Sequence, residues 1–286
     1  MVTGASSGIG RATVLRLVES GFRVFAGVRR DEDAASLRDE GGALVHPVKI
    51  DVTDASAVRA AADRVAALLE GRGLDGLVNN AGIAVTAPVE HIALDVLRRQ
   101  FEVNVFGQIA VTQAFLPLLR EARGRIVNIG SVGAHITIPF GGALCGSKSA
   151  FNALSDALRM ELAPSGIRVS IVEPGSIATP AVEKTLGDVE AVVRALPPAA
   201  QGRYGDRLRA FTRHAHAREA SGSPPDVVAR AVLHALTAVR PRIRYVVGKD
   251  ARLLVTLARI LPDAWLDRLR VRLLGLGPAT RSLARA

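Results

Sequence analysis

The sequence predicts an α/β protein built on a doubly wound parallel sheet with helices on both faces. Three observations predict this architecture. Short runs rich in valine and isoleucine alternate with longer amphipathic stretches, at the spacing of strand–helix–strand units. These runs lack the polar alternation of half-exposed strands, which indicates burial on both faces. A glycine-rich loop, residues 3–10, joins the first run to the first amphipathic stretch.

Each expected strand is a short apolar run, and each expected helix is a longer segment with apolar residues every three or four positions. The first run is unusually short, since it begins at Met1 and reaches the glycine loop at Gly4, whereas strands usually have about five or six residues. Either this strand is truncated or the natural start lies a few residues upstream, and we favour the second explanation. The expected strands are 1–3, 23–28, 44–49, 76–79, 124–129, 168–173 and 245–247, and the expected helices include 10–20, 55–70, 94–120, 148–163 and 225–238.

Length and composition favour one large domain. The chain has 286 residues, of which 49% are hydrophobic, and this is enough to bury a sizeable core over residues 1–248, followed by an extension over 249–286. The one cysteine, Cys145, cannot form an internal disulfide, and the start has neither a basic leader nor an apolar signal region. These features favour a reducing, cytoplasmic setting. No apolar run is long enough to predict a membrane span.

The extension carries most of the formal charge of +10. From residue 240 to the end, eleven Lys or Arg stand against three Asp, so the first 239 residues carry only +2. Two amphipathic segments, 251–261 and 263–276, are separated by Pro262, with Asp263 as the expected helix cap. They can lie on an anionic membrane surface, or their leucines can pack on the body or on a partner subunit. No nucleic-acid partner is expected, because 4% aromatic residues offer few stacking platforms.

The loop TGASSGIG, residues 3–10, predicts a phosphate-binding turn. Its glycines, Gly4, Gly8 and Gly10, allow a tight turn and let backbone amides at a helix N-terminus approach a pyrophosphate. Taken alone, the triplet also fits an ordinary strand-to-helix turn, and only its context favours the phosphate site. The other candidate residues of the loop are Ser6, Ser7 and Ile9.

The end of the second expected strand bears on the identity of the cofactor. About twenty residues after such a loop, an acidic side chain binds the ribose hydroxyls of NAD, whereas an arginine can pair with the additional phosphate of NADP. Arg29 and Arg30 occupy this point, so we predict NADP and consider NAD less favoured. The alternative is that both arginines are solvated while Asp31 or Asp33 reaches back to the ribose.

Further motifs follow the glycine loop in order: DVTD (51–54), NNAG (79–82), NVFG (104–107), IVNIGS (126–131) and EPGSIAT (173–179). With this ordered set the chain resembles the short-chain dehydrogenase/reductase family over roughly residues 2–248. The resemblance implies a Rossmann fold and an NAD(P)-dependent oxidoreductase of alcohols and ketones. It also implies a homodimer or homotetramer formed through the long helices around 97–120 and 148–163.

The resemblance further implies roles for individual residues. Asn104 corresponds to the helix residue that holds a proton-relay water, and Ser131 to the hydroxyl that polarises the substrate. Lys148 corresponds to the lysine that grips the nicotinamide ribose. The other family positions surround the cofactor: Asp51 and Val52 beside the adenine, Asn79, Ala81 and Gly82 in the turn after the fourth strand, and Pro174, Gly175, Ile177 and Thr179 on the carboxamide side.

Leu144 stands where the family has its catalytic tyrosine, four residues before Lys148. A phenol beside an ammonium group can exchange a proton with the substrate oxygen near neutral pH, and a leucine cannot; the loss typically costs ~10²–10⁴-fold in rate. Three explanations stay open: an oxidoreductase with a weak or relocated proton donor, a cofactor-binding sensor or scaffold without turnover, and a substitution in an otherwise ordinary enzyme. The intact Ser131, Lys148 and Asn104 favour the first or the third.

Other side chains are candidate proton donors. Cys145 follows Leu144, but consecutive helical residues point about 100° apart, so we expect it to be a packed small side chain. His135, in the segment after Ser131, can lean over the pocket, although most loop histidines are merely solvated. Tyr204 and Tyr245 lie too far along the chain to replace the tyrosine by spacing.

The segment at about 180–225 mixes helix breakers with short helical turns and, in this family, roofs the pocket beside the nicotinamide. Its apolar residues favour an apolar substrate, such as a lipid-like or polycyclic alcohol or ketone, and can equally be packing residues. Within the family, the segment GFRVFAGVRR (21–30) and the long C-terminus are most similar to the retinol- and steroid-type members. The apolar residues are Leu186, Val189, Val192, Val193, Leu196, Leu208 and Phe211.

Overall fold

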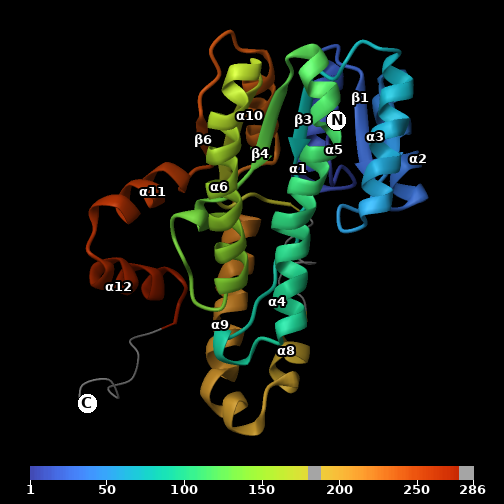
Figure 1. The fold of residues 1–286 in the computed structure, drawn as a ribbon. Coiled ribbons are helices and arrows are strands. Elements are labelled where there is room, and N and C mark those ends of the chain that lie inside the picture. Colours follow the sequence, from blue (N-terminus) through green and yellow to red (C-terminus); the bar gives the residue numbers. More distant parts are fainter. Residues whose placement is uncertain (180–187, 277–286) are drawn as a thin grey trace.

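The computed structural model describes residues 1–179 and 188–276, and a parallel sheet lies at their centre (Figure 1). Val2 joins its two parts, because it bridges Ala26 on one side and Val78 on the other. The spatial order is therefore β2–β1–Val2–β3–β4–β5–β6: all strands are parallel, and the strand order reverses at Val2, as in a doubly wound fold. The strands are β1 Val24–Val28, β2 Val45–Lys49, β3 Gly76–Asn79, β4 Arg125–Ile129, β5 Arg168–Pro174 and β6 Arg244–Val247.

The expected first strand, residues 1–3, lies in the predicted central place but forms only a bridge. The amide of Val2 donates to the carbonyl of Phe25 at 2.9 Å, and the amide of Thr3 donates to the carbonyl of Val78 at 3.0 Å. Gly4 then adopts a φ of +62° and turns the chain away from the sheet. Three residues are too few for a continuous ladder, and this is the physical reason for the difference.

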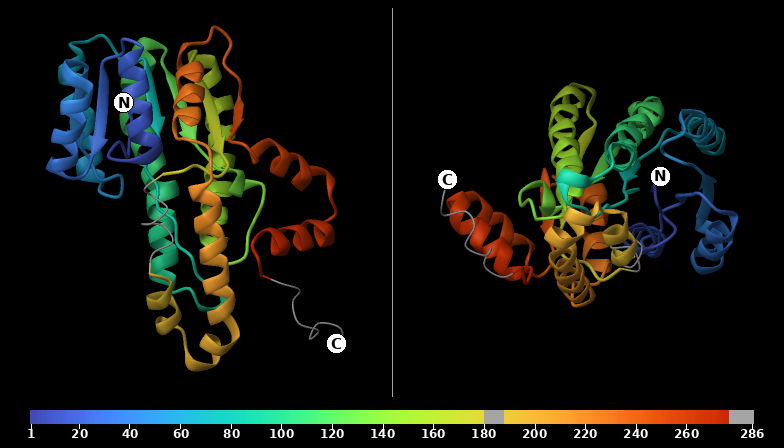
Figure 2. Two further views of the ribbon diagram at one scale, coloured as in Figure 1. Left: turned by 180° about the vertical axis from the view of Figure 1, so that it is seen from behind. Right: turned by 90° about the horizontal axis from the view of Figure 1, so that it is seen from below.

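Helices cover both faces of the sheet (Figure 2). One core packs Val14, Leu37 and Val232 against the sheet, and the other packs Val65, Phe115 and Leu162. Helix α2 was not among the expected helices, because its apolar content is low. The helices of the first face are α1 Gly8–Glu19, α2 Asp31–Gly41 and α10 Asp226–Thr237, and those of the second are α3 Ala55–Leu69, α5 Gly107–Ala122 and α6 Gly142–Leu162.

The helix expected over 94–120 is interrupted. It consists of α4 Leu94–Phe101, a π-helical segment η3 Glu102–Phe106 and α5. Such π segments are frequent at functional sites, and this one contains Asn104. In addition, α6 begins at Gly142, six residues before the expected start. The short 3₁₀ helices are η1 Gly42–Leu44, η2 Val89–His91, η4 Val132–Ala134 and η5 Ala163–Ser165.

The segment expected to hold only short helical turns contains α8 Val189–Ala195 and the 23-residue helix α9 Pro198–Ala220. That expectation was wrong because the breaker Pro198 occupies the first turn of α9, where a proline is tolerated. Both helices extend beyond the carboxyl ends of the strands, below the sheet in Figure 1. Leu186 lies outside the described residues.

The extension forms α11 Ala251–Ile260 and α12 Asp263–Leu273. Pro262, not Asp263, is the N-cap of α12, and no side-chain hydrogen bond caps the helix, so the expected capping role was wrong. Val255, Leu266 and Leu274 are buried. The inner side of the extension therefore packs on the body, in agreement with one of the expected alternatives. No helix within residues 1–179 and 188–276 is long and apolar enough to cross a membrane.

Candidate functional site

The glycine-rich loop lies between Val2 and α1 and packs tightly against the turn after β3. A Cβ at Gly10 would lie 2.1 Å from the carbonyl oxygen of Gly4, so only glycine fits there. Gly8 has a φ of +54°, which also favours glycine. Ser7 precedes α1 without a side-chain cap hydrogen bond, so the first amides of the helix keep their capacity to bind an anion. Ser6 and Ile9, the other candidates in this loop, are half-buried.

Thr3 and Asn80 hold this loop in place, a role that their positions in TGASSGIG and NNAG did not reveal. The Nδ2 of Asn80 donates to the carbonyl oxygens of Thr3 at 2.9 Å and Gly4 at 3.1 Å. The Thr3 hydroxyl accepts from the amides of Asn80 and Ala81 at 3.0 and 3.1 Å. The only sequence signal was the second asparagine of NNAG. Asn79 is buried and donates to Thr112 instead.

Two arginines follow β1, as expected. Both are exposed, and the guanidinium of Arg30 forms a two-bond ion pair with Asp33, with nitrogen–oxygen distances of 3.0 and 2.9 Å. Asp31 pairs with Lys49 at 3.0 Å. Among the described residues, each of the two acids considered as ribose ligands is therefore paired with a cation.

Asp51 lies at the end of β2, next to the buried Val52. Partial burial would raise the pKa of the Asp51 carboxyl, but hydrogen bonds from the Thr53 amide and hydroxyl and the nearby Arg29 outweigh burial and lower it. The carboxylate is therefore ionised at neutral pH. The electrostatic effect of Arg29 on this carboxyl indicates that Asp51 lies on the same side of the sheet as the predicted phosphate-binding arginines.

Asn104 connects the segment after β3 to α6. Its Oδ1 accepts from the amide of Ile83 at 2.9 Å, and its Nδ2 donates to the Ile83 carbonyl at 2.9 Å and to the Ser147 hydroxyl at 3.2 Å. Ser147 in turn donates to the Leu144 carbonyl at 2.8 Å. Asn104 thus fixes the first turns of α6, and a Cβ at Gly82 would lie 3.4 Å from its Oδ1.

Ser131 and Lys148 lie at the carboxyl end of β4. The ammonium group of Lys148 donates to the carbonyl of Ile129 at 2.7 Å, and burial lowers the pKa of Lys148 to about 8. The Ser131 Oγ accepts from the Gly133 amide at 2.9 Å, which leaves its proton for another acceptor. Leu144 is half-buried and lies one helical turn before Lys148, on the same side of α6.

The loop after β5 returns to the glycine-rich loop. The Gly175 amide donates to the Val247 carbonyl at 2.8 Å, and Ile177 pairs with Ser223. A Cβ at Gly8 would lie 3.2 Å from the Cβ of Thr179, so the two predicted cofactor loops face each other. Pro174 ends β5 and is buried.

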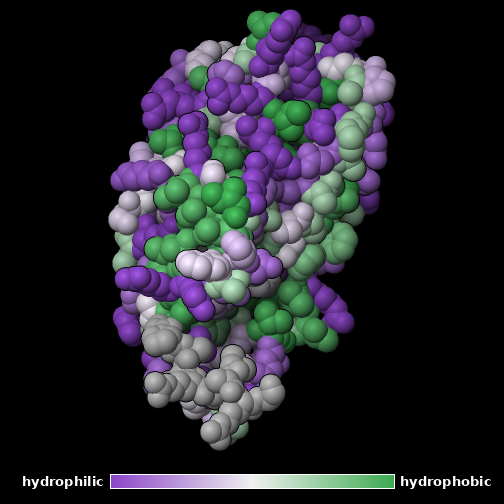
Figure 3. Space-filling view, turned by 90° about the vertical axis from the view of Figure 1, so that its left-hand side faces the viewer, coloured by the Kyte–Doolittle hydropathy of each residue, from purple (hydrophilic) through white to green (hydrophobic). Residues whose placement is uncertain are grey.

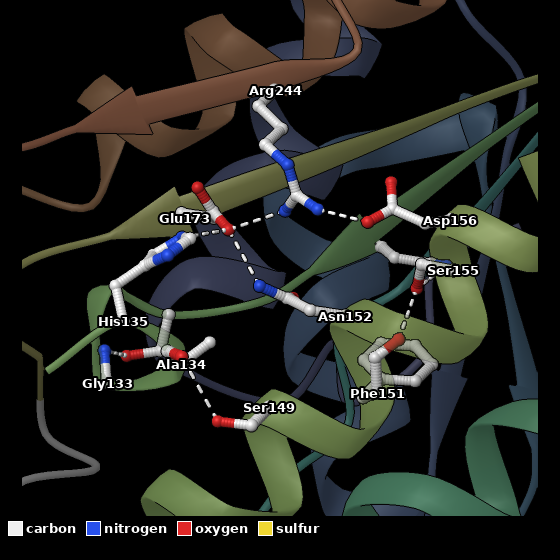
Figure 4. Close-up of polar contacts among 12 residues, drawn as sticks. Gly133, Ala134, His135, Ser149, Phe151, Asn152, Ser155, Asp156, Glu173 and Arg244 are labelled. Carbon is white, nitrogen blue, oxygen red and sulfur yellow. Dashed lines mark hydrogen bonds and ion pairs between the residues drawn. The ribbon is translucent and has the colours of Figure 1, made fainter. Parts of the chain in front are cut away.

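A polar cluster lies behind this site, between the η4 segment, α6, β5 and β6 (Figure 4). Glu173 is fully buried, and its Oε1 accepts from Arg244 at 2.8 Å and from Asn152 at 2.7 Å. His135 Nε2 lies 2.8 Å from the same oxygen, so its ring faces Glu173 and does not lean over the pocket as one hypothesis held. Arg244 also binds Asp156 on α6. Burial would raise the pKa of Glu173, but His135, Arg244 and Asn152 outweigh it and lower this pKa.

Arg244→Met is expected to destabilise the protein by about 3 kcal/mol at neutral pH, because it leaves the buried Glu173 carboxylate without its cation. Urea unfolding measures the difference. The pKa of Glu173 is lowered by folding, so the stability from this cluster is complete above its ordinary pKa and is lost as the pH falls through the folded value. The deficit of the variant should therefore shrink in acid. Arg213→Met, at an exposed arginine of α9, is the control.

The other candidate proton donors make contacts with other parts of the protein. Cys145 is buried, its pKa is raised by burial, and its sulfur lies 3.7 Å from the Ile136 carbonyl, which confirms that it is a packed side chain. Tyr204 lies on α9 in the segment at about 180–225 that is expected to roof the pocket, here called the lid, and it donates to Glu90 of η2. Tyr245 accepts from the Arg242 amide at 2.9 Å, in the last strand. Neither tyrosine lies on the first turns of α6.

The glycine-rich loop, residues 3–10, is called the glycine cradle below. A doubly wound parallel sheet with such a cradle at the point where the strand order reverses defines a dinucleotide-binding protein. The family model described as short chain dehydrogenase matches residues 1–189. The chain belongs to this short-chain dehydrogenase/reductase family and is an oxidoreductase by the names of its relatives.

Three known proteins illustrate the similarity. Retinol dehydrogenase 5 from Homo sapiens is 41% identical over 277 residues, covering 93% of this chain and 85% of that protein. An NADPH-dependent 3-dehydrocapnine reductase from Ornithobacterium rhinotracheale is 34% identical, covering 94% of each chain. A short-chain dehydrogenase from Burkholderia cenocepacia, solved with NADP, has a TM-score of 0.70 and 29% identity, covering 94% of this chain and 95% of that one.

The residues present fit a nicotinamide dinucleotide. The position of Gly10 leaves no room for a side chain, as expected where backbone must approach a pyrophosphate closely. Among the described residues, Lys148 has one hydrogen bond, to Ile129, which leaves two ammonium protons for ribose hydroxyls. The cradle and the ammonium group lie at the same end of the sheet.

Proposed function

We propose that the chain is an NADP(H)-dependent oxidoreductase of an apolar alcohol or ketone, whose rate is lowered by Leu144. The observation that carries the proposal is the position of Lys148, whose ammonium group donates to the carbonyl of Ile129 at the end of β4, two residues before Ser131. The residues that would hold the dinucleotide are those of the cradle (Gly4, Ser6, Ser7, Gly8, Ile9 and Gly10), with Arg29, Arg30, Asp51, Val52, Asn79, Ala81, Gly82, Lys148, Pro174, Gly175, Ile177 and Thr179.

The proposed chemistry divides between the cofactor and the chain. A bound nicotinamide supplies or accepts the hydride. Ser131 can donate its hydroxyl proton to the substrate oxygen, since its lone pair already accepts from Gly133. Leu144 cannot move a proton, so the nearest ionisable group on this side of α6 is Lys148 Nζ, whose pKa of about 8 allows proton exchange near neutral pH. This arrangement supports slow turnover rather than none.

Arg29→Ala and Arg30→Ala are each expected to weaken NADPH binding about tenfold and to leave NADH binding unchanged. The reason is that a charge-assisted bond to the additional phosphate exists only with the phosphorylated cofactor. Calorimetric titration with both cofactors measures the effect. Arg38→Ala, in the last turn of α2, is the matched control. Equal losses for both cofactors would contradict this assignment.

The apolar composition of the lid supports the proposal that the substrate is apolar. Its helices pack with the segment before α6 and with the end of the extension in one apolar cluster. Leu208 and Phe211 are almost fully buried in this cluster, as packing residues are. We therefore expect the half-buried Val189, Val192 and Tyr204 to lie nearest the substrate. The name of retinol dehydrogenase 5 is consistent with an apolar alcohol.

Assembly into a homodimer or homotetramer through α4, α5 and α6 is also part of the proposal. These helices and the π segment between them expose large apolar side chains, with Phe106 at 58%, Leu154 at 42% and Met160 at 60%. Exposed apolar patches of this kind are typical of association surfaces. Sedimentation velocity measures the oligomeric state directly.

Titration with NADPH, combined with turnover of a panel of apolar ketones, tests the proposed function. We expect tight NADPH binding and slow, measurable reduction. Binding without any turnover would favour a cofactor-binding sensor or scaffold, which is the second candidate because Leu144 removes the usual proton donor. Absence of NADPH binding would reject both.

A further inference from the structure

The outer face of the extension places large apolar side chains in water. Leu253 is 63% exposed, Ile260 is 68% exposed and Trp265 is 64% exposed. Figure 3 shows an apolar patch in the middle of this side of the molecule, with hydrophilic residues around it. We call the exposed and half-buried apolar side chains on the outer side of these two helices the extension face; they are Leu253, Leu257 and Ile260 on α11 and Trp265, Leu269 and Leu273 on α12.

Helical periodicity explains the arrangement on α11. Residues three or four positions apart share one side of a helix. Ala251 and Val255 are buried and form the side that packs on the body. Leu253, with Ile260 seven positions later, is rotated by about 200° from Ala251 and points almost directly away from the body. Packing on the body therefore accounts for the inner side of α11 and leaves the outer apolar stripe without a partner among the described residues.

Cations flank this stripe. Arg252 and Arg259 on α11 are exposed and lie about 100° from the inner side, beside the apolar stripe. Arg268 and Arg272 are exposed on α12. The two exposed acids of these helices are Asp263, in the first turn of α12, and Asp267, which pairs with Arg270 at 2.8 Å. The face thus presents a net positive charge around an apolar centre.

We infer that the extension face binds the surface of an anionic lipid bilayer. The apolar stripe would enter the interfacial region, and the flanking arginines would reach the lipid phosphates, as in helices that lie in the membrane plane. A symmetric contact with a second copy fits the charges less well, because a two-fold axis would place the same four arginines opposite one another. This inference concerns binding alone and does not depend on catalysis.

The location of this face links it to the substrate lid. On their inner side, α12 and the residues after it contribute Val271, Leu274 and Leu276 to the apolar cluster that contains Leu208 and Phe211 of α9. A bilayer bound to the outer side of the extension would therefore lie one helix away from the lid. The position is suited to a protein that draws an apolar substrate from a membrane, and this last step rests on the proposed function.

Trp265 provides a direct test, because it is the only tryptophan in the chain. The full-length protein is mixed with phosphatidylcholine vesicles with and without phosphatidylglycerol. We expect a blue shift of Trp265 emission and co-sedimentation with the anionic vesicles, both reduced by added salt. Leu253→Ser and Ile260→Ser should each weaken binding roughly tenfold, because each removes buried apolar area from the bound state. Val239→Ser, at an 83% exposed residue outside this face, is the control and should bind as the parent does.

Several outcomes would overturn the inference. Trp265 emission that does not respond to anionic vesicles would do so, as would equal binding by the parent and the Ile260→Ser variant. Concentration-dependent self-association through this face, with no response to lipid, would assign it to a second copy instead. NADPH binding is measured on the same preparations, so a failure of the proposed function is recognised separately from a failure of membrane binding, and unchanged NADPH binding shows that the variants are folded.

Discussion

Leu144→Tyr is expected to raise the rate of ketone reduction by about 10²–10⁴-fold, with little change in NADPH affinity. The new phenol would stand one helical turn before Lys148, whose ammonium group would lower the pKa of the phenol and allow proton exchange near neutral pH. Asn104 and Ser147 already fix this turn of α6, so the backbone needs no rearrangement. Steady-state kinetics with NADPH and an apolar ketone provide the measurement.

Leu144→Phe is the matched control, because it adds the same ring without the hydroxyl. We expect the phenylalanine variant to remain as slow as the parent. Equal turnover by all three proteins would mean that a proton donor other than residue 144 already serves the reaction. Gains of similar size in both variants would instead assign the effect to packing of an aromatic ring. Either result would contradict the conclusion that the missing phenol limits the rate.

Gly10→Ala is expected to reduce NADPH affinity by at least about 100-fold. A Cβ at this position would lie 2.1 Å from the Gly4 carbonyl oxygen and 2.5 Å from Asn80 Nδ2, so the loop must move. Movement of the loop removes several charge-assisted hydrogen bonds to the pyrophosphate, each worth roughly 1.5–3 kcal/mol. The clash also costs about 1–3 kcal/mol of folding stability. Calorimetric titration and urea unfolding measure the two effects separately.

Gly202→Ala serves as the control for this second substitution. Gly202 lies within α9, and a Cβ there meets no atom within 4 Å. Alanine is the better helix former, so this variant should be more stable than the parent by up to about 1 kcal/mol, with unchanged NADPH affinity. A folded Gly10→Ala protein that binds NADPH as tightly as the parent would show that the cradle does not hold the cofactor.

Local patterns predicted the sheet better than the helices. The strand expected at 76–79 has those limits, and β1, β2, β4 and β5 each differ by one residue at one end. Runs of valine and isoleucine are a local signal, because each side chain is buried within its own strand. The helices were less predictable: the π segment at Glu102–Phe106 and the full length of α9 depend on contacts with distant segments, which no local pattern encodes.

The site divides in a similar way. Gly4, Gly8 and Gly10 could be assigned from the sequence, because their need for a side-chain-free backbone is a property of the turn itself. Thr3 and Asn80 could not, because their role is a set of hydrogen bonds across 76 to 78 residues of chain. From its position after Ser131, His135 could either lean over the pocket or be solvated, and in the structure it faces the buried Glu173 instead.

The sequence by itself determined the fold and the family, because these follow from residue types at short, fixed spacings. The positions around a dinucleotide and the replacement of the tyrosine by Leu144 are predictions from the same spacings. Only the tertiary structure decided which side chains are already engaged: His135 by Glu173, Arg30 by Asp33, and Asn104 by Ile83 and Ser147. It alone divided the extension into a buried side and an exposed apolar face. The physical reason is that burial and pairing depend on neighbours brought together by folding, which the order of residues along the chain does not specify locally.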